Sequence, residues 1–206
     1  MPKAFSEQEK ETIRQQLREQ GQQLFARHGL KKTSVDDLTQ AVGISKGAFY
    51  HFYDSKEELL MEILESIEVA MQTRILDAVL QQDKAGEAGA RRTVGAVLTR
   101  FLLLWDEYPL LKEFSQEDYM ILVRKLPAAR VEQHQAQDER FINSLTEKFA
   151  QEGITLQRSP RVMANLVKSL FFVGLHREEL GDAAYQETMT ILVDLIAGYL
   201  TEEAHL

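Results

Sequence analysis

The sequence predicts an all-α fold. Apolar residues recur at helical spacing along most of the 206 residues, and no stretch alternates apolar and polar residues for long enough to indicate a strand. Pro109, Pro127 and Pro160 each fall at the start of an apolar-periodic segment, where the missing N–H of proline costs least. A chain of this length can bury one core, or a small core and a medium one.

Three of the first four helices are expected to begin at capping boxes, in which a serine is followed three residues later by an acid. The pairs are Ser6–Glu9, Ser34–Asp37 and Ser55–Glu58. Gly29 is expected to end the first helix, because glycine tolerates the left-handed conformation of a helix end. The apolar stripe of the fourth helix runs from Leu59 to Val79. That helix therefore extends for about 25 residues, or roughly 37 Å, and can belong to two domains.

Residues 81–89 are rich in Asp, Lys, Ala and Gly and are interpreted as a loop. The apolar-periodic segments after this loop lie at 91–108, 110–125, 128–151, 160–177 and 183–200. Together with the four amino-terminal helices, these five segments predict nine helices. We expect two domains, residues 1–54 and residues 55–206.

The most informative segment is Val35–Tyr53, which reads VDDLTQAVGISKGAFYHFY. Its first half has helical apolar spacing, Gly43 supplies the backbone freedom of a tight corner, and Ser45 caps a second helix. The second helix directs small and hydrogen-bonding residues outward, namely Lys46, Gly47, Ala48, Tyr50 and His51, while Phe49 and Tyr53 face inward. The pattern predicts a helix-turn-helix whose second helix meets the major groove of DNA.

The charge distribution is compatible with DNA binding even though the net charge is -8. Residues 1–60 contain nine basic and nine acidic residues, so the whole excess of acid lies in residues 61–206. Between Leu38 and Tyr53 there is no acid at all. What matters for a nucleic-acid partner is the local charge of the binding surface rather than the total.

Composition also excludes several classes of protein. Without cysteine, the chain has no disulfide framework, thiolate nucleophile or thiolate metal site. The amino terminus lacks the apolar core of a signal peptide, and the longest apolar run, Phe101–Trp105, is far too short to span a membrane. We therefore expect a cytoplasmic protein with no membrane partner.

Residues from about Ile13 to Leu60 are similar to the amino-terminal domain of the TetR family of transcriptional regulators. The similarity is carried by Gly29, Thr33–Leu38, Ala41–Gly47, Phe49–Tyr53 and Ser55–Leu59. It implies a helix-turn-helix domain over residues 1–54 and a helical ligand-binding and dimerisation domain over residues 55–206. It also implies a homodimer, usually a repressor, that binds a near-palindromic operator in double-stranded DNA.

The resemblance assigns roles to nine residues of the motif. Lys46, Gly47 and Ala48 present the amino end of the recognition helix to base edges, where lysine can donate to guanine and the alanine methyl can touch thymine. The residues expected to hold phosphates are Thr33, Ser34, Ser45, Tyr50, His51 and Lys56.

The last two helices carry apolar residues on more than one face, over 162–175 and 189–200. A helix that is apolar on two faces needs two partners. We expect one face to enter the core of the chain and the other to meet a second copy, giving a four-helix dimer interface with Gly174 and Gly198 at close approach. The alternative is a wide core within a single chain.

The carboxy-terminal domain is rich in bulky aromatic residues that could line a pocket for a mostly apolar small-molecule effector. The candidates are Phe101, Trp105, Phe114, Tyr119, Phe141, Phe171 and Phe172, with His176 near the end of the set. The same rings could simply fill the core, and His176 could be a hydrogen-bonded histidine at the dimer seam. In an alternative interpretation this domain docks a protein partner and has no cavity.

Two other patterns are weaker. Residues 43–47 fit the G-x-S-x-G nucleophile elbow around Ser45, but that elbow needs a strand before the serine, and the sequence predicts a helix there. His134 and Asp138, with Glu132 or Asp182, have the spacing of a metal pair but lie in a strongly polar run typical of a solvated face. We therefore expect no enzymatic activity, no cofactor and no metal.

Overall fold

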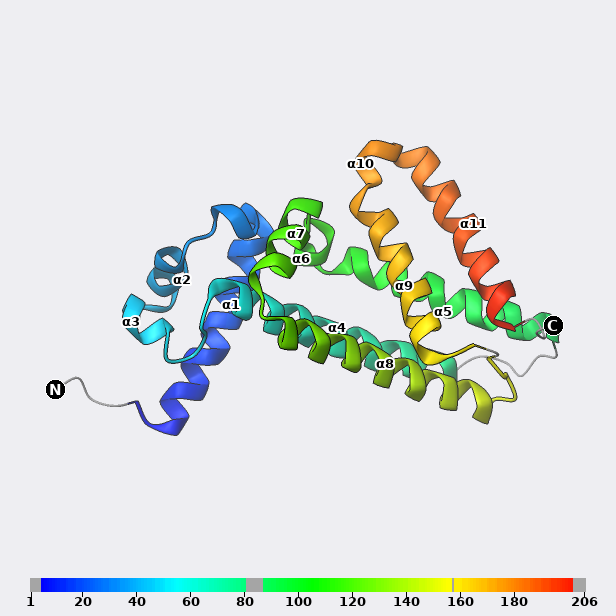
Figure 1. Ribbon diagram of the computed structural model, residues 1–206, viewed down its shortest axis with the longest axis horizontal. Helices are drawn as coiled ribbons and strands as arrows, with labels where there is room; N and C mark the ends of the chain where they lie inside the picture. The colour runs from blue at the N-terminus through cyan, green and yellow to red at the C-terminus, as the bar shows by residue number, and fades with distance from the viewer. Residues whose placement is uncertain (1–4, 81–86, 157, 202–206) are drawn as a thin grey trace. The chain divides into compact units, whose positions relative to one another are not determined.

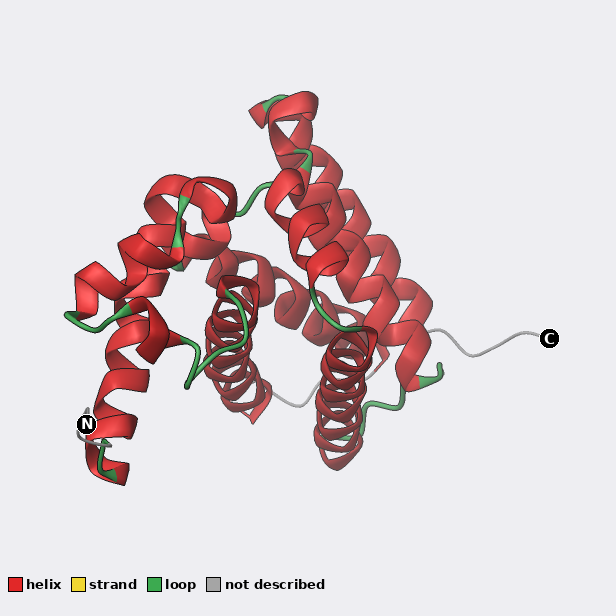
Figure 2. Ribbon diagram, turned by 60° about the vertical axis from the view of Figure 1, so that its left-hand side comes forward, coloured by secondary structure: helices red, strands yellow, loops and turns green. Residues whose placement is uncertain are grey.

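The computed structural model describes residues 5–80, 87–156 and 158–201, and helices dominate this part of the chain (Figures 1 and 2). No strand occurs within these ranges, so the predicted all-α fold is confirmed. The helices are α1 (Glu7–Lys32), α2 (Val35–Val42), α3 (Lys46–Phe49), α4 (Lys56–Leu80), α5 (Glu87–Glu107), α6 (Pro109–Lys112), α7 (Gln116–Lys125), α8 (Ala128–Gln151), α9 (Pro160–Leu175), α10 (Arg177–Leu180) and α11 (Asp182–Thr201).

The chain forms two compact units. The first consists of Met1–Glu68 and Tyr108–Ala128, and the second of Val69–Glu107 and Ala129–Leu206. The boundary after Glu68 lies inside α4, so this long helix contributes residues to both units. The division into domains 1–54 and 55–206 stays a prediction, because a compact unit in the structure is not the same as a segment that folds independently.

The three predicted helix caps form. The hydroxyl oxygens of Ser6, Ser34 and Ser55 each accept a hydrogen bond from the backbone N–H three residues later, at 3.1 to 3.2 Å. Gly29 does not end α1 but breaks it, with φ 73° and ψ 167°, and a further helical turn follows to Lys32. The glycine thus has a positive φ that favours glycine, one turn before the end of the helix, but its ψ differs from that of the left-handed helix end that the sequence indicated.

In the first unit, α1 packs against α2, α6 and α7. The buried apolar side chains of this unit are Leu17, Phe25, Leu30, Leu38, Phe49, Tyr53, Leu59, Leu60, Met61, Ile63, Leu64, Ile67, Leu110, Leu111, Phe114, Leu122 and Leu126. Most of them come from α1 to α4, and the remainder come from a segment that lies about fifty residues further along the chain. Residues 108–128 therefore belong to the core that supports α2 and α3.

In the second unit, α11 packs along α5 and α9, and α10 joins α9 to α11 (Figure 1). The described residues form eleven helices where the sequence predicted nine, because the expected helix 110–125 is divided and the short helix α10 lies between the expected segments 160–177 and 183–200. Ser115 starts a new helix by capping α7, and the backbone leaves the helical path at His176 between α9 and α10. Of the expected loop 81–89, residues 81–86 lie outside the described residues and residues 87–89 are the first turn of α5.

None of the helices in the described ranges combines the length and the apolar content that crossing a bilayer requires.

Candidate nucleic-acid interface

The corner between α2 and α3 is built by Gly43. This residue has φ 75° and ψ 30°, and the next N–H, of Ile44, donates to the carbonyl of Thr39 at 3.1 Å. A Cβ at Gly43 would meet nothing within 4 Å, so the position requires glycine for its backbone conformation rather than for space. The left-handed corner fixes the direction in which α3 leaves α2.

Helix α3 has a buried side and an exposed side. Phe49 is 0% exposed and Tyr53, just after the helix, is 6% exposed, as the sequence predicted. Their rings pack together with centroids 5.9 Å apart, and burial raises the pKa of Tyr53 above its usual range. Lys46, Gly47, Tyr50 and His51 are exposed and Ala48 is half-buried. The short helix thus offers small and polar groups to the solvent.

Two polar side chains at the start of α3 are held in defined positions. The Ser45 hydroxyl oxygen accepts from the N–H of Ala48 at 3.2 Å and caps the helix. The ammonium of Lys46 forms an ion pair with the carboxylate of Asp36 on α2, with Nζ and Oδ2 2.9 Å apart. This hydrogen bond and the negative charge raise the pKa of Lys46.

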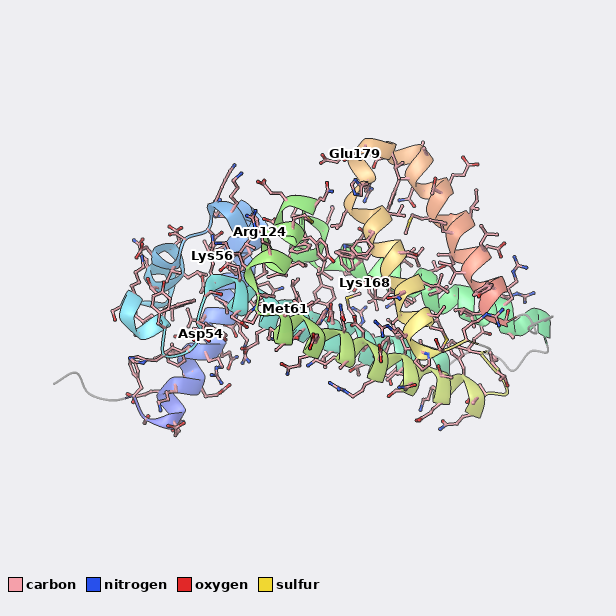
Figure 3. The ribbon with its side chains drawn as sticks, in the orientation of Figure 1. Asp54, Lys56, Met61, Arg124, Lys168 and Glu179 are labelled. Carbon is pink, nitrogen blue, oxygen red and sulfur yellow. The ribbon has the colours of Figure 1, made fainter. Side chains whose placement is uncertain are left out.

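Thr33, Ser34 and Lys56 meet where α1 ends and α2 begins, and each is engaged by the chain itself. The buried Thr33 hydroxyl donates to the carbonyl of Gly29 at 2.8 Å. The ammonium of Lys56, labelled in Figure 3, donates to the carbonyls of Leu30 and Thr33, both at 2.6 Å. These carbonyls terminate α1, so Lys56 stabilises the negative end of that helix.

The Ser34 hydroxyl donates to the carboxylate of Asp37 at 2.6 Å and accepts from the Asp37 N–H at 3.1 Å. The backbone N–H of Ser34 donates to the same carboxylate at 2.8 Å, which completes the capping box of α2. The hydrogen bonds from the Ser34 side chain and backbone lower the pKa of Asp37. Whether Thr33, Ser34 or Lys56 also touches a phosphate stays a prediction.

A groove of about 940 Å³ lies beside α3, and its lining adds residues that the motif did not indicate. The lining residues are Phe5, Glu7, Lys10, Glu11, Arg14, Ser45, Gly47, Ala48, His51 and Phe52. Lys10 and Arg14 come from α1, one helical turn apart, and bring positive charge to the flank of the recognition helix. The Nε of Arg14 is buried and has no hydrogen-bond partner among the described residues. The only sequence signal for this pair was its i, i+4 spacing on the first helix.

Four of the aromatic ligand candidates form a continuous series of ring contacts in the second unit. Phe101 and Trp105 on α5 have centroids 6.3 Å apart, Trp105 and Phe171 4.8 Å, and Phe171 and Phe172 on α9 5.5 Å. Phe141 is half-buried on α8 in the same unit.

The remaining two aromatic candidates belong to the first unit, where Phe114 is buried and burial raises the pKa of Tyr119.

The remaining candidates lie on α8, at the end of α9 and before α3. The Nδ1 of His176 lies 2.9 Å from the carboxylate of Glu179 on α10, at the exposed end of α9. His134 and Asp138 lie one turn apart on α8, with ligand atoms within 4.8 Å of each other. Ser45 follows helix α2 and not a strand, so the context that a nucleophile elbow needs is not present there.

Comparison with known proteins supports the interpretation of residues 17–63, which match the model of the family described as bacterial regulatory proteins, tetR family. The HTH-type transcriptional repressor KstR2 of Rhodococcus jostii is 51% identical over 41 residues, which are 20% of this chain and 20% of that protein. The HTH-type transcriptional repressor DhaR of a Mycobacterium species is 33% identical over 70 residues, 32% of this chain and 35% of that protein. The chain thus spans only a fifth to about a third of the length of these curated relatives.

Solved structures extend the likeness of the fold to nearly the whole chain. A TetR-family transcriptional regulator of Pectobacterium atrosepticum has a TM-score of 0.65 at 22% identity, over 96% of this chain and 99% of its own. At this identity the likeness concerns the fold alone. The family model, the helix-turn-helix geometry of α2 and α3 and the helical architecture agree: residues 17–63 form an amino-terminal domain of the type found in the TetR family of bacterial regulatory proteins, and the fold of the chain is like that of a TetR-family regulator.

Proposed function

We propose that the protein is a homodimeric DNA-binding repressor whose affinity for its operator is changed by a mostly apolar small molecule. The observation that carries the proposal is the helix-turn-helix itself. Its left-handed corner at Gly43 and its buried Phe49 hold α3 with Lys46 and Gly47 exposed, within a segment that matches the family's DNA-binding domain. This is the arrangement in which a short helix can enter a major groove.

In this function the exposed side of α3 reads the bases. Lys46 would donate to the O6 and N7 acceptors of guanine, Ala48 would contact a thymine methyl group, and Gly47 would let the backbone approach the base edges. Ser45, Tyr50 and His51 would hold phosphates on either side of the groove. Phosphate contacts fix the register of the protein and contribute most of the affinity that is lost at high salt.

The groove beside α3 adds Lys10 and Arg14 to the phosphate-binding set. Both residues line it together with His51, so a phosphate in the groove would meet their side chains. Glu7 and Glu11 also line the groove and reduce its net positive charge. The phosphate contact would therefore come from the Arg14 side chain itself and not from a general excess of positive charge in the groove.

The proposed dimer forms through α9 and α11. Both helices expose large apolar side chains, whose exposed fractions in the single chain run from 38% to 59%: Val162, Phe172, Ile191, Leu195 and Tyr199. A surface of this kind on neighbouring helices is suited to a twofold four-helix interface. The two recognition helices would then meet half-sites about one helical turn, roughly 34 to 36 Å, apart.

The proposed effector contacts the aromatic series of Phe101, Trp105, Phe171 and Phe172. Support comes from a structural neighbour, the TetR-family repressor FadR of Thermus thermophilus, solved in complex with lauroyl-CoA, which has a TM-score of 0.64 at 16% identity over 94% of this chain and 98% of its own. Helix α4 has residues in both units and would carry the change to the DNA-binding residues. A coupling of about 1 to 3 kcal/mol, typical of such linkage, would change operator affinity several-fold to about a hundredfold.

The test of DNA binding starts from a randomised duplex library, from which the full chain selects its preferred sites. We expect an inverted repeat whose half-sites are one turn apart. Lys46→Ala should relax base preference, whereas Tyr50→Phe and Arg14→Gln should weaken binding to all sequences. Enrichment of no sequence over the starting library would contradict the proposal.

The test of the effector is a thermal shift screen with acyl-CoA thioesters and free fatty acids of graded chain length. Stabilisation that rises with ligand concentration, and that is reduced in Trp105→Ala, is the expected result. Stabilisation by none of these compounds would favour the alternative in which the second unit docks a protein.

A further inference from the structure

Asp36 is the one acidic side chain that forms an ion pair with the recognition helix among the described contacts. It lies in the first turn of α2, and its Oδ2 is 2.9 Å from the Nζ of Lys46, the first residue of α3. Both side chains are well exposed, Asp36 at 68% and Lys46 at 54%, so the ion pair lies on the surface and not in the core. Ten residues separate the partners in sequence, and the corner at Gly43 brings them together.

A carboxylate in this position lowers the affinity for DNA of arbitrary sequence. It cancels the charge of the nearest lysine, and it adds negative charge next to the phosphates that line the groove. The ion pair also contributes little to folding, because exposed pairs of this kind contribute at most about 1 kcal/mol. Asp36 also places a negative charge in the first turn of α2, where it favours the helix. In the bound state the same carboxylate has partners in the major groove.

The major-groove edge of one base pair offers those partners. In a G·C pair, guanine presents the acceptors N7 and O6, and cytosine presents the N4 amino donor beside them. A lysine next to an aspartate presents the complementary set, a donor and an acceptor about 3 Å apart. Lysine prefers guanine because it can reach both acceptors, and aspartate accepts from cytosine N4. In an A·T pair the N6 amino donor of adenine takes the place of guanine O6, and the O4 acceptor of thymine takes the place of cytosine N4, so the ammonium meets a donor and the carboxylate meets an acceptor.

We propose that Asp36 is a specificity-determining residue, and that Asp36 and Lys46 together read one G·C base pair in each half-site. The Lys46 ammonium donates to guanine O6 and N7, and the Asp36 carboxylate accepts from cytosine N4. The same carboxylate weakens binding to other sequences, because there it meets phosphates and no amino donor. The inference rests on the proposed DNA-binding function and adds the residue that selects the base pair.

The test compares the full chain with Asp36→Asn, Asp36→Ala and Lys46→Met. The control is Glu117→Gln, which removes one exposed negative charge from a comparable ion pair, Glu117–Lys31 at 2.6 Å, in the same compact unit. Each protein selects from the randomised duplex library. Its affinity is then measured by fluorescence anisotropy for the selected site, for copies of that site with each G·C pair replaced by A·T, and for a scrambled duplex at several salt concentrations.

For the unmodified chain, one G·C replacement per half-site should cost about five- to hundredfold in affinity, the discrimination expected of one good base contact. Asp36→Ala and Lys46→Met should lose this penalty at that same position while keeping the penalties elsewhere, and Asp36→Asn, whose amide keeps an acceptor oxygen, should lose a smaller part of it. The two Asp36 variants should also bind the scrambled duplex more tightly than Glu117→Gln does, which separates a local effect from the change in net charge. Thermal unfolding of each variant checks that the fold is retained.

The result that overturns the inference is a selected site at which both Asp36 variants discriminate G·C from A·T as strongly as the unmodified chain at every position. In that case the proposed function stands and only the role of Asp36 fails. If the unmodified chain enriches no site, the proposed function fails, and the inference fails with it.

Discussion

At the scale of single residues, the chain uses its charged side chains near the DNA-binding motif in two different ways. Lys46 is exposed and paired with another exposed side chain, whereas the ammonium of Lys56 is held by two backbone carbonyls at the end of α1. From sequence alone both lysines suggest contacts to DNA. The structure separates them, because a lysine that already satisfies two helix-terminal carbonyls has a structural task of its own.

Replacing Lys56 by methionine should lower stability, and the salt dependence of DNA binding then tests the predicted phosphate contact of this lysine. The change leaves the carbonyls of Leu30 and Thr33 without their donor, which costs about 1 to 3 kcal/mol for groups that stay shielded from water. The free energy of unfolding is measured in urea, and the dependence of the binding constant on salt is measured on a selected duplex.

Lys32→Met is the matched control for Lys56→Met, because Lys32 is exposed in the last turn of α1 and loses the same charge. A fall of about one in the slope of log K against log salt for Lys56→Met, with unchanged stability, would instead assign Lys56 to a phosphate.

At the scale of helices, the features predicted best from sequence were those that depend on residues close together in the chain, such as helix caps. The caps at Ser6, Ser34 and Ser55 formed as expected because a capping box is a matter of four consecutive residues. The separation of α6 from α7 was missed because the apolar period continues across residues 113–115, while the cap at Ser115 interrupts the helix.

Partners that are distant in sequence have no such local signal. The ion pair of Asp36 and Lys46 depends on the corner at Gly43, and the hydrogen bond from Leu30 to Asp118 joins residues 88 positions apart. For the same reason the sequence identified the aromatic ligand candidates but did not show that Phe114 and Tyr119 lie in the first unit and the others in the second.

Asp118 is expected to hold α7 on the broken end of α1. Its buried carboxylate accepts from the N–H of Leu30 at 2.9 Å, just after the break at Gly29. Asp118→Ala leaves that N–H buried without a partner and should cost about 1 to 3 kcal/mol, whereas Asp118→Asn keeps an acceptor and should cost less.

The measurements for Asp118 are urea unfolding and the hydrogen exchange rate of the Leu30 amide. That exchange should be faster in Asp118→Ala than in Asp118→Asn. Equal protection of this amide in the two variants would show that the carboxylate is dispensable for holding it.

The cap of α2 predicts how stability changes with pH. Hydrogen bonds from Ser34 lower the pKa of Asp37 in the folded state, so this carboxylate stabilises the fold above its ordinary pKa. That stabilisation is lost as the pH falls through the lowered folded pKa. The stability difference between the unmodified chain and Asp37→Asn should therefore be constant near neutrality and shrink below about pH 4.

Urea unfolding at a series of pH values measures the difference for Asp37. Asp54→Asn, which removes an exposed acid outside any cap, is the control. A difference between the unmodified chain and Asp37→Asn that stays constant down to pH values well below 4 would contradict the role of the ionised cap.

At the scale of the whole molecule, the proposed function depends on pairing two recognition helices, and the proposed interface is the exposed apolar surface of α9 and α11. Leu195 on α11 is 59% exposed in the single chain, and Leu103 on α5 is 54% exposed in the same unit. The two leucines are alike in exposure and chemistry but lie on different helices. Substituting a charge at each position therefore distinguishes an interface from an ordinary exposed side chain.

Leu195→Glu should convert the dimer to a monomer, because two carboxylates would be buried at a twofold interface without partners. Leu103→Glu should leave the dimer intact. Sedimentation velocity measures the assembly state, and anisotropy measures affinity for the selected inverted repeat. Loss of the dimer should weaken operator binding by about 10² to 10⁴-fold, because this is the gain in affinity that linking two half-site contacts provides. Binding to a single half-site should change little. If the Leu195→Glu protein stays dimeric and the Leu103→Glu protein dissociates, the dimer interface lies on α5 and not on α11.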